Sequence, residues 1–415
     1  MKKIISRFLA IIFILSLVIA IPTKETVQAA VDNNTLENMI NTTVDYLVKK
    51  DALYGNEWSV VAIARSKKSI PSSYYDKYYK SVEGKIMEEV KKAVPFTSDV
   101  AKSDWTSITD AEKLVLALNS IGKDPKNVVG LNLVDLIWNR EGLGNNGVSE
   151  LAYALIALDS KNYEAPANSK NTRSSIITKM LSLRTGDGGF SWDNTAATAD
   201  IDTTAMVVQA LAKYYDRPEV KTAVDTCLNI LKNNQTAKGD YVSVYGSQTY
   251  ESPCTAAQVV VALDNLKKNP TLVQSGFVKT MDLIDVMTSY YVQGGGFKNS
   301  STDETPDNIA STQLLYALVS YERLLEGKNS LYDLIDVSVQ AKQLEPQKEE
   351  PKVQQIEVQD RSVATNVTAG DTAKSSEVNE IKTGDNGSFN VLLIIMAVMT
   401  GVMVVIRKKS LKEVR

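Results

Sequence analysis

The chain has 415 residues, of which 44% are hydrophobic, and its formal charge is −3. Basic residues number 46 and acidic residues 49, and no basic stripe marks any expected helix, which argues against a nucleic-acid partner. The chain has no histidine and only two cysteines, so it lacks the commonest general base and cannot build a four-thiolate zinc site. We therefore expect neither a metal nor a cofactor.

The first 29 residues have the pattern of an export signal. A basic head ending at Arg7 precedes an apolar stretch at 8–21, and small residues at 27–29 suit cleavage. A permanent helical anchor is the alternative, but the apolar stretch is short for a membrane span. We expect residues 1–29 to be a signal peptide and the mature chain to be exported.

Residues 31–330 show a repeat of helical hairpins. One kind of helix is amphipathic, as at 218–234, with its apolar side chains on one stripe. The other kind is apolar nearly all round, as at 203–211 and 254–263, and such a helix is buried on all sides. The buried kind recurs every 40 to 55 residues or so and ends in Ala-Leu, with closing leucines at Leu118, Leu158, Leu211, Leu263 and Leu318.

Six amphipathic helices are expected to lie outside, each preceding one buried helix. Their expected starts are near Asn34, Tyr74, Asn127, Asn171, Pro218 and Thr271. An open solenoid would show polar residues on its concave side, so fully apolar inner helices favour a closed barrel of hairpins. The predicted fold class is all-α, a six-hairpin α/α toroid.

Glycine-rich turns with an aromatic residue precede the inner helices, at 186–192, 239–241 and 294–297. The stretch DGGFSW followed by DIDTTAMVVQAL resembles the repeat of the squalene-cyclase and protein-prenyltransferase superfamily, which implies a six-hairpin α/α toroid. The resemblance spans roughly 31–330. The same toroid occurs in vitamin-B12 carriers, in complement-type thioester domains and in bacterial surface proteins.

The activities of that superfamily fit this chain unevenly. Its prenyltransferases hold a catalytic zinc with a histidine, which is absent here. Its thioester domains need a Cys-Gly-Glu-Gln signature, which neither Cys227 nor Cys254 supplies. Its class II cyclases carry Asp-x-Asp-Asp with the middle aspartate as proton donor. Asp200 and Asp202 match the first two acids and Thr203 replaces the last, so Asp202 and Thr203 would be catalytic only if the chain is an enzyme.

The two aspartates differ in their place in the repeat. Asp200 lies eleven residues before Leu211, where other repeats carry Ser252 and Asp307, so it is most simply a helix N-cap. Asp202 stands where the other repeats carry no acid. Two interpretations remain open for it: an acid favoured by the helix dipole, or an acid facing a cavity at the mouth of the ring.

Aromatic residues near the starts of inner helices are the remaining site candidates. Trp58, Trp105 and Trp192 fall at equivalent places, and Phe190 belongs to the glycine-rich turn. Core packing is one interpretation. The other is an exposed aromatic rim suited to a sugar, an isoprenoid or a corrinoid ring, with Asp200 nearby.

The C-terminal part has the pattern of a tether. Residues 331–388 are polar with almost no aromatics, as in a disordered stalk. An apolar stretch at 389–406 predicts a transmembrane anchor, and the basic tail 407–415 predicts a cytoplasmic end. Thr383-Gly384 before the anchor resembles a Gram-positive sorting signal without its Leu-Pro pair, which leaves sortase-mediated cell-wall attachment and plain membrane retention both open.

These patterns predict a secreted, surface-anchored toroid that acts as a binding or adhesion module. Its partner would be a small hydrophobic molecule, a glycan or a surface protein, and the membrane through the anchor. The alternative is a cyclase-like or isomerase enzyme that uses Asp202 as a general acid on an isoprenoid. An isolated toroid shelters a reactive cation poorly from water, which favours the binding module.

Overall fold

The computed structural model describes residues 31–50, 52–92, 108–245 and 248–339. These residues are mostly helical, which confirms the predicted predominance of α-helix. The signal peptide 1–29, the anchor 389–406, the tail 407–415, Thr383-Gly384 and Trp105 lie outside them. Among the described residues, no helix has the length and apolarity needed to cross a membrane.

The inner helices are those that the sequence marks as apolar all round. Every residue from Thr203 to Leu211 is buried, and the five closing leucines have no exposed surface. Most residues of the other inner helices are also buried, although Ile309 and Leu325 of α13 are exposed. The bounds of the inner helices are α3 (Glu57–Arg65), α5 (Ile108–Ser120), α7 (Val148–Asp159), α9 (Ile201–Leu211), α11 (Pro253–Asn265) and α13 (Asn308–Leu325).

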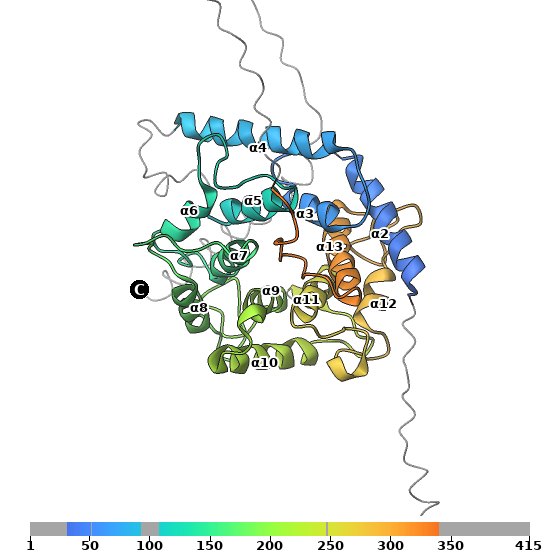
Figure 1. Cartoon of the computed structure of the whole chain (residues 1–415). Helices are drawn as coiled ribbons and strands as arrows, with labels where there is room; N and C mark the ends of the chain where they lie inside the picture. The colour runs from blue at the N-terminus through green and yellow to red at the C-terminus, as the bar shows by residue number, and fades with distance from the viewer. Residues whose placement is uncertain (1–30, 51, 93–107, 246–247, 340–415) are drawn as a thin grey trace, which may run out of the picture. The chain divides into compact units, whose positions relative to one another are not determined.

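Each inner helix contacts the next one along the chain. The series runs from α3 to α5, α7, α9, α11 and α13, and α13 then contacts α3. Figure 1 shows these helices in the middle of the described region, with the other helices around them. The contacts of the inner helices therefore close on themselves.

The outer helices pack mainly against the inner helix that precedes them. Helix α6 contacts α5, α8 contacts α7, α10 contacts α9 and α12 contacts α11. Helix α4 reaches α3 through the Tyr78 hydroxyl, which donates to Glu57 Oε1 at 3.3 Å. The bounds of the outer helices are α2 (Asn33–Val48), α4 (Ser72–Lys92), α6 (Leu133–Asn139), α8 (Arg173–Ser182), α10 (Pro218–Asn233) and α12 (Leu283–Thr288).

Two outer helices start later than the sequence predicts. Helix α6 begins after Asn132, whose side chain accepts hydrogen bonds from two backbone N–H groups of the first turn. Helix α12 begins after Asp282, which caps it in the same way. The expected starts near Asn127 and Thr271 instead fall in turns, because a helix begins where a cap satisfies its free N–H groups.

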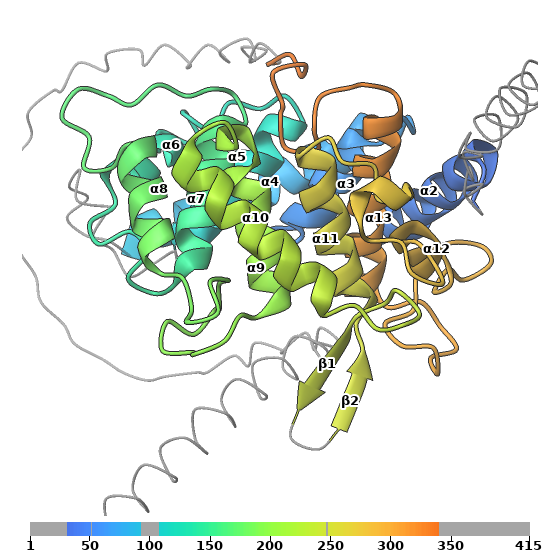
Figure 2. The same cartoon turned by 90° about the horizontal axis from the view of Figure 1, so that it is seen from below.

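A β-hairpin departs from the all-α prediction. Strands β1 (Val242–Tyr245) and β2 (Gln248–Glu251) pair antiparallel, with Val242 opposite Glu251. The hairpin stands between α10 and α11 in the chain. Figure 2 shows it projecting from the helices on one face of the described region.

The first and last hairpins meet where the ring of contacts closes. Helix α2 contacts α13, and the glycine-rich turn before α13 lies against α2. A Cβ atom added at Gly295 would lie 2.2 Å from the backbone oxygen of Thr42, and Gly295 has a φ of +121°. Only glycine fits this close approach.

Replacing Gly295 by alanine is expected to destabilise the fold by roughly 2–4 kcal/mol, because it adds a backbone clash to an unfavourable φ. Gly294→Ala is the matched control, since Gly294 has a φ of +99° but no atom within 4 Å of the added Cβ. Urea unfolding of both variants measures the difference. Equal losses would contradict the close contact between the turn and α2.

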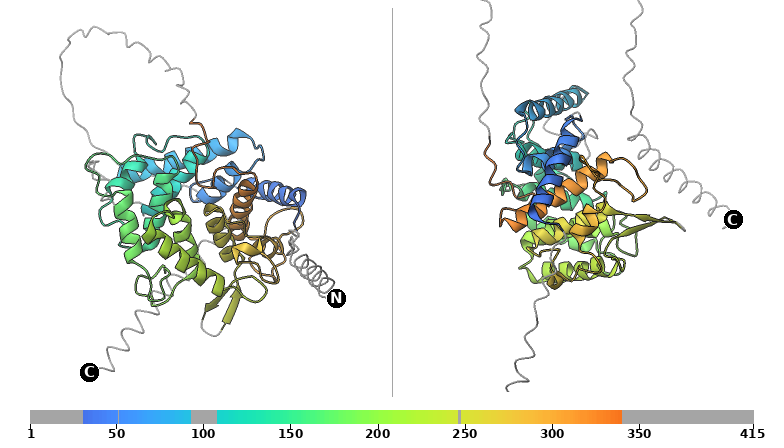
Figure 3. Two further views of the ribbon diagram at one scale, coloured as in Figure 1. Left: turned by 60° about the horizontal axis from the view of Figure 1, so that its bottom comes forward. Right: turned by 90° about the vertical axis from the view of Figure 1, so that its right-hand side faces the viewer.

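The packed region extends beyond the boundary that the sequence suggests. The sequence predicts that the stalk begins at Leu331, but Leu331 and Leu334 have no exposed surface and Tyr332 is 7% exposed. We call residues 330–339 the strap. Figures 2 and 3 show this segment, at the red end of the colour scale, on the face opposite the β-hairpin. The strap therefore belongs to the folded region.

Candidate functional site

Asp200 is the N-cap of α9, as its place in the repeat predicts. Its Oδ1 accepts hydrogen bonds from the backbone N–H of Thr203 at 2.7 Å and from the Thr203 hydroxyl at 2.6 Å. The Thr203 hydroxyl therefore donates to Asp200 and not to Asp202. Asp307 caps α13 in the same way, accepting from the N–H of Ala310 at 2.8 Å.

Asp202 lies in the first turn of α9, two residues after the N-cap Asp200. Solvent reaches its side chain, yet protein surrounds it on most sides. This partial burial raises its pKa to about 6, with the Thr255 hydroxyl opposing the rise and the Asp200 charge adding to it. The charge of Asp202 also acts on Tyr153 and Tyr316. Asp202 lies in the first turn of α9 and lines neither described pocket, so the helix-dipole acid and the cavity-facing acid both stay open as interpretations.

The aromatic candidates separate into three environments. Phe190 has no exposed surface and lies in the core, while Trp192 is 61% exposed. Trp58 lies between these extremes, in the first turn of α3. Phe190 is therefore a core residue and cannot belong to an exposed aromatic rim.

Trp58 is the centre of an aromatic cluster inside the inner helices. Its ring centroid lies 5.4 Å from that of Tyr153 on α7, 6.4 Å from that of Tyr316 on α13 and 6.0 Å from that of Tyr332 on the strap. These tilted pairs are the arrangement that aromatic quadrupoles favour. We call Trp58, Tyr153, Tyr316 and Tyr332 the aromatic cluster.

Amide groups continue this layer on the neighbouring inner helices. Gln209 Nε2 on α9 donates to Gln258 Oε1 on α11 at 2.9 Å, and Gln258 Nε2 bonds the Tyr316 hydroxyl. Polar side chains placed inside apolar helices are costly unless they are hydrogen-bonded. The hydrogen bonds among Gln209, Gln258 and Tyr316 offset that cost and join the amide groups to the aromatic cluster.

A pocket of about 180 Å³ lies at the starts of α3 and α13, and we call it the mouth pocket. Trp58 and Tyr74 give it aromatic surface, and its other side chains are mostly uncharged. Burial raises the pKa of Tyr74 to about 12, so its hydroxyl is protonated at neutral pH. The lining residues are Leu47, Lys50, Gly55, Asn56, Trp58, Ser59, Tyr74, Asn308, Ile309, Thr312 and Gln313.

Two side-chain amides on α13 offer hydrogen-bond donors to the mouth pocket. Asn308 Oδ1 accepts from the Tyr46 hydroxyl at 2.8 Å, which fixes the orientation of that amide. Gln313 Oε1 accepts two long bonds of 3.4 Å, from Gln258 and Tyr316. Among the described residues, Asn308 Nδ2 and Gln313 Nε2 donate to no acceptor. Both N–H₂ groups are available to a ligand.

Sequence reasoning missed most of the mouth pocket. Ser59, Thr312 and Gln313 lie in inner helices whose residues are mostly apolar. Ser59 Oγ and Thr312 Oγ1 are 2.7 Å apart and bond each other across α3 and α13. Polar residues inside an all-round apolar helix were the available signal.

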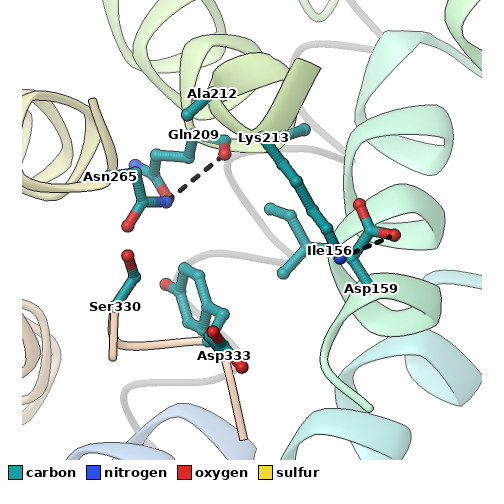
Figure 4. A pocket seen from close by; sticks show the side chains of 10 residues that line it. Ile156, Asp159, Gln209, Ala212, Lys213, Asn265, Ser330 and Asp333 are labelled. Atoms are coloured by element: carbon teal, nitrogen blue, oxygen red, sulfur yellow. Dashed lines mark hydrogen bonds and ion pairs between the residues drawn. The ribbon is translucent and has the colours of Figure 1, made fainter. Parts of the chain in front are cut away.

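A second pocket of about 210 Å³ lies at the other ends of α7, α9 and α11, and we call it the strap pocket. Figure 4 shows Lys213 reaching Asp159, with an ion-pair distance of 3.6 Å. Asp159 also bonds Arg173 at 2.6 Å and the Tyr214 hydroxyl at 2.7 Å. The strap forms one wall, through Ser330, Tyr332 and Asp333.

The two cysteines are separate free thiols, and burial raises the pKa of each to about 12. In the described part of the chain, no group of three or more acids or cysteines is placed to hold a metal ion. A comparison with protein-family models finds no match, and a comparison with curated proteins finds none.

Proposed function

We propose that residues 31–339 form an α/α toroid whose mouth pocket binds a single sugar ring of a glycan. The closed series of contacts among the inner helices supports the toroid, and the outer helices in Figure 1 surround that series. The superfamily resemblance of the glycine-rich repeat supports the same architecture. The module is non-catalytic in this proposal.

The composition of the mouth pocket carries the proposal. An aromatic face from Trp58 and Tyr74 suits the apolar face of a pyranose, and donors from Asn308 and Gln313 suit its hydroxyl oxygens. Leu47 and the exposed Ile309 add an apolar corner that suits the methyl of an acetamido group. We therefore choose N-acetylglucosamine as the first probe.

The size of the mouth pocket opposes a large hydrocarbon substrate. A pocket for a drug-sized ligand holds roughly 300–1,000 Å³, whereas the mouth pocket holds about 180 Å³. Asp202 lines neither the mouth pocket nor the strap pocket. A cyclase that uses Asp202 needs its substrate beside that carboxyl, so the raised pKa alone does not favour the enzyme.

The proposed setting is the cell surface, with the module exported and held by its C-terminal anchor. Support comes from the sequence patterns at 1–29, 389–406 and 407–415. The strap and the β-hairpin lie on opposite faces in Figure 3. A tether that continues from the strap would leave the face with the hairpin open to a ligand.

Binding of methyl glycosides of glucose, galactose and N-acetylglucosamine, measured by isothermal titration calorimetry, tests the proposal. One shallow pocket is expected to give a Kd of about 1 mM, or roughly −4 kcal/mol. Gln313→Leu removes a donor and is expected to weaken binding roughly twofold to tenfold. Gln274→Leu, at an exposed position outside the pocket, is the matched control. No binding, or equal effects of the two variants, would refute the glycan site.

A further inference from the structure

The strap closes the end of the ring where the inner helices terminate. The Leu334 N–H donates to the backbone oxygen of Ser160, the C-cap of α7, at 2.9 Å. Lys161 bonds the backbone oxygen of Val337. Leu331 and Leu334 are fully buried there. Other strap residues face the solvent: Ile335 is 54% exposed and Val339 is 55% exposed.

One carboxylate holds the strap electrostatically. Asp336 accepts hydrogen bonds from Arg65 Nη1 and from Arg323 Nη2, each at 2.8 Å. The side chains of Arg65 and Arg323 are only 3% and 8% exposed, whereas that of Asp336 is 38% exposed. Burial opposes ionisation, but the two guanidinium groups hold the pKa of Asp336 below its usual value. Asp336 is therefore ionised at neutral pH and neutralises two nearly buried cations.

The strap also reaches the residue that faces the mouth pocket. Tyr332 packs against the Trp58 ring at 6.0 Å between centroids. Trp58 in turn lines the mouth pocket, and Tyr332 lines the strap pocket. The aromatic pair of Trp58 and Tyr332 thus connects the mouth pocket with the strap pocket, which lie at opposite ends of the inner helices. Movement of Tyr332 would remove one of the three rings that hold Trp58.

We propose that the strap is a displaceable latch that positions Trp58 for ligand binding, with Tyr332 as the positioning residue. The binding half of this proposal rests on the glycan site proposed above. Local opening is expected for a short terminal segment held by a few contacts. The strap leads directly into the stretch predicted to tether the module, so a pull on that tether would act first on Asp336 and Leu334. The latch thereby couples tension on the predicted tether to the position of Trp58 in the mouth pocket.

Docking of the strap and binding of a ligand in the mouth pocket are thermodynamically linked in this proposal, so each must affect the other. If the docked strap favours ligand binding, then a bound ligand must stabilise the docked strap by the same factor. N-acetylglucosamine at ten times its Kd is expected to slow hydrogen exchange of the Leu334 amide by roughly tenfold, because the ligand binds only the docked state. Exchange of the Leu334 amide is thus expected to respond to a ligand in the mouth pocket, which the strap does not line.

The test uses the full chain labelled with 5-fluorotryptophan, with the Trp58 resonance assigned from Trp58→Phe. Asp336→Ala is expected to speed exchange of the Leu334 amide by roughly tenfold to hundredfold, since it removes two charge-assisted hydrogen bonds. The Trp58 fluorine signal is expected to shift or broaden, while that of the buried Trp138 stays fixed. Asp333→Asn is the matched control, because within the described part of the chain the Asp333 side chain on the same strap bonds only the Ile335 N–H.

The outcomes separate this inference from the proposed function. A Trp58 signal that moves in Asp336→Ala while no sugar binds wild type would support the latch and refute the glycan site. A sugar that binds wild type while neither the Trp58 signal nor Leu334 exchange responds would overturn the latch and keep the glycan site. A shift in Tyr332→Ala that Tyr332→Phe does not show would support positioning by the ring itself.

Discussion

Trp58→Ala is expected to destabilise the folded region by roughly 2–4 kcal/mol, somewhat less than the loss of a fully buried aromatic side chain, because Trp58 is half-buried. The Trp58 ring contacts three tyrosine rings that come from α7, α13 and the strap. Its loss would leave a cavity where parts of the chain far apart in sequence meet. Thermal and urea unfolding of the variant measure the loss.

Trp192→Ala is the matched control for this substitution. Trp192 is 61% exposed, so its removal is expected to change the free energy of unfolding by no more than about 0.5 kcal/mol. A small loss in Trp58→Ala, comparable with that of the control, would mean that the aromatic cluster is not packed as described. It would also remove the basis for the connection between strap and mouth pocket.

The folded region is expected to lose stability as the pH rises above about 4, because of Asp264. This carboxyl on α11 is 2% exposed, and neither oxygen has a hydrogen-bond partner among the described residues. Burial raises its pKa well above the ordinary value, against the opposing effects of Ser320 and Lys267. A raised folded-state pKa gives a contribution that is complete below the unfolded pKa and lost as pH rises towards the folded pKa.

Asp264→Asn removes this titration and should flatten the pH dependence. The difference in unfolding free energy between variant and wild type is expected to change by about 1.4 kcal/mol per pH unit above pH 4, in favour of the variant. Urea unfolding between pH 4 and pH 8 measures it. Asp216→Asn, at an exposed position, is the control. Parallel curves for wild type and Asp264→Asn would show that Asp264 is ionised in the folded protein.

The inner helices could be predicted from the sequence because apolar side chains on nearly all of their sides indicate burial. A helix that is apolar on all sides must be surrounded by other parts of the protein. The closing leucines from Leu118 to Leu318 are all fully buried. The cap at Asp200 was predictable for a similar reason, since its role depends on neighbours within three residues.

The β-hairpin was missed although the sequence carries a signal for it. The run from Tyr241 to Tyr245 consists of valine and tyrosine around a single serine, which favours a strand, and a Gly-Ser pair follows it. The helical repeat around it masked this short pattern. The strap was missed for another reason: the burial of Leu331 and Leu334 depends on the open end of the ring, which no local pattern describes.

The mouth pocket could be predicted only in part. Trp58 was a candidate from its place in the repeat, but its partners depend on which helices become neighbours. Ser59 and Thr312 are far apart in sequence and bond each other only because α13 contacts α3. Asp202 lines neither described pocket, so its predicted place at a cavity stays a prediction.

A crystal of the protein soaked with methyl N-acetylglucosaminide tests the central claim most directly. The account predicts one sugar ring in the mouth pocket, stacked on the exposed side of Trp58, with its hydroxyl oxygens within hydrogen-bond distance of Asn308 Nδ2 and Gln313 Nε2. An empty mouth pocket beside a sugar bound elsewhere, or a sugar that avoids the Trp58 face, would contradict it.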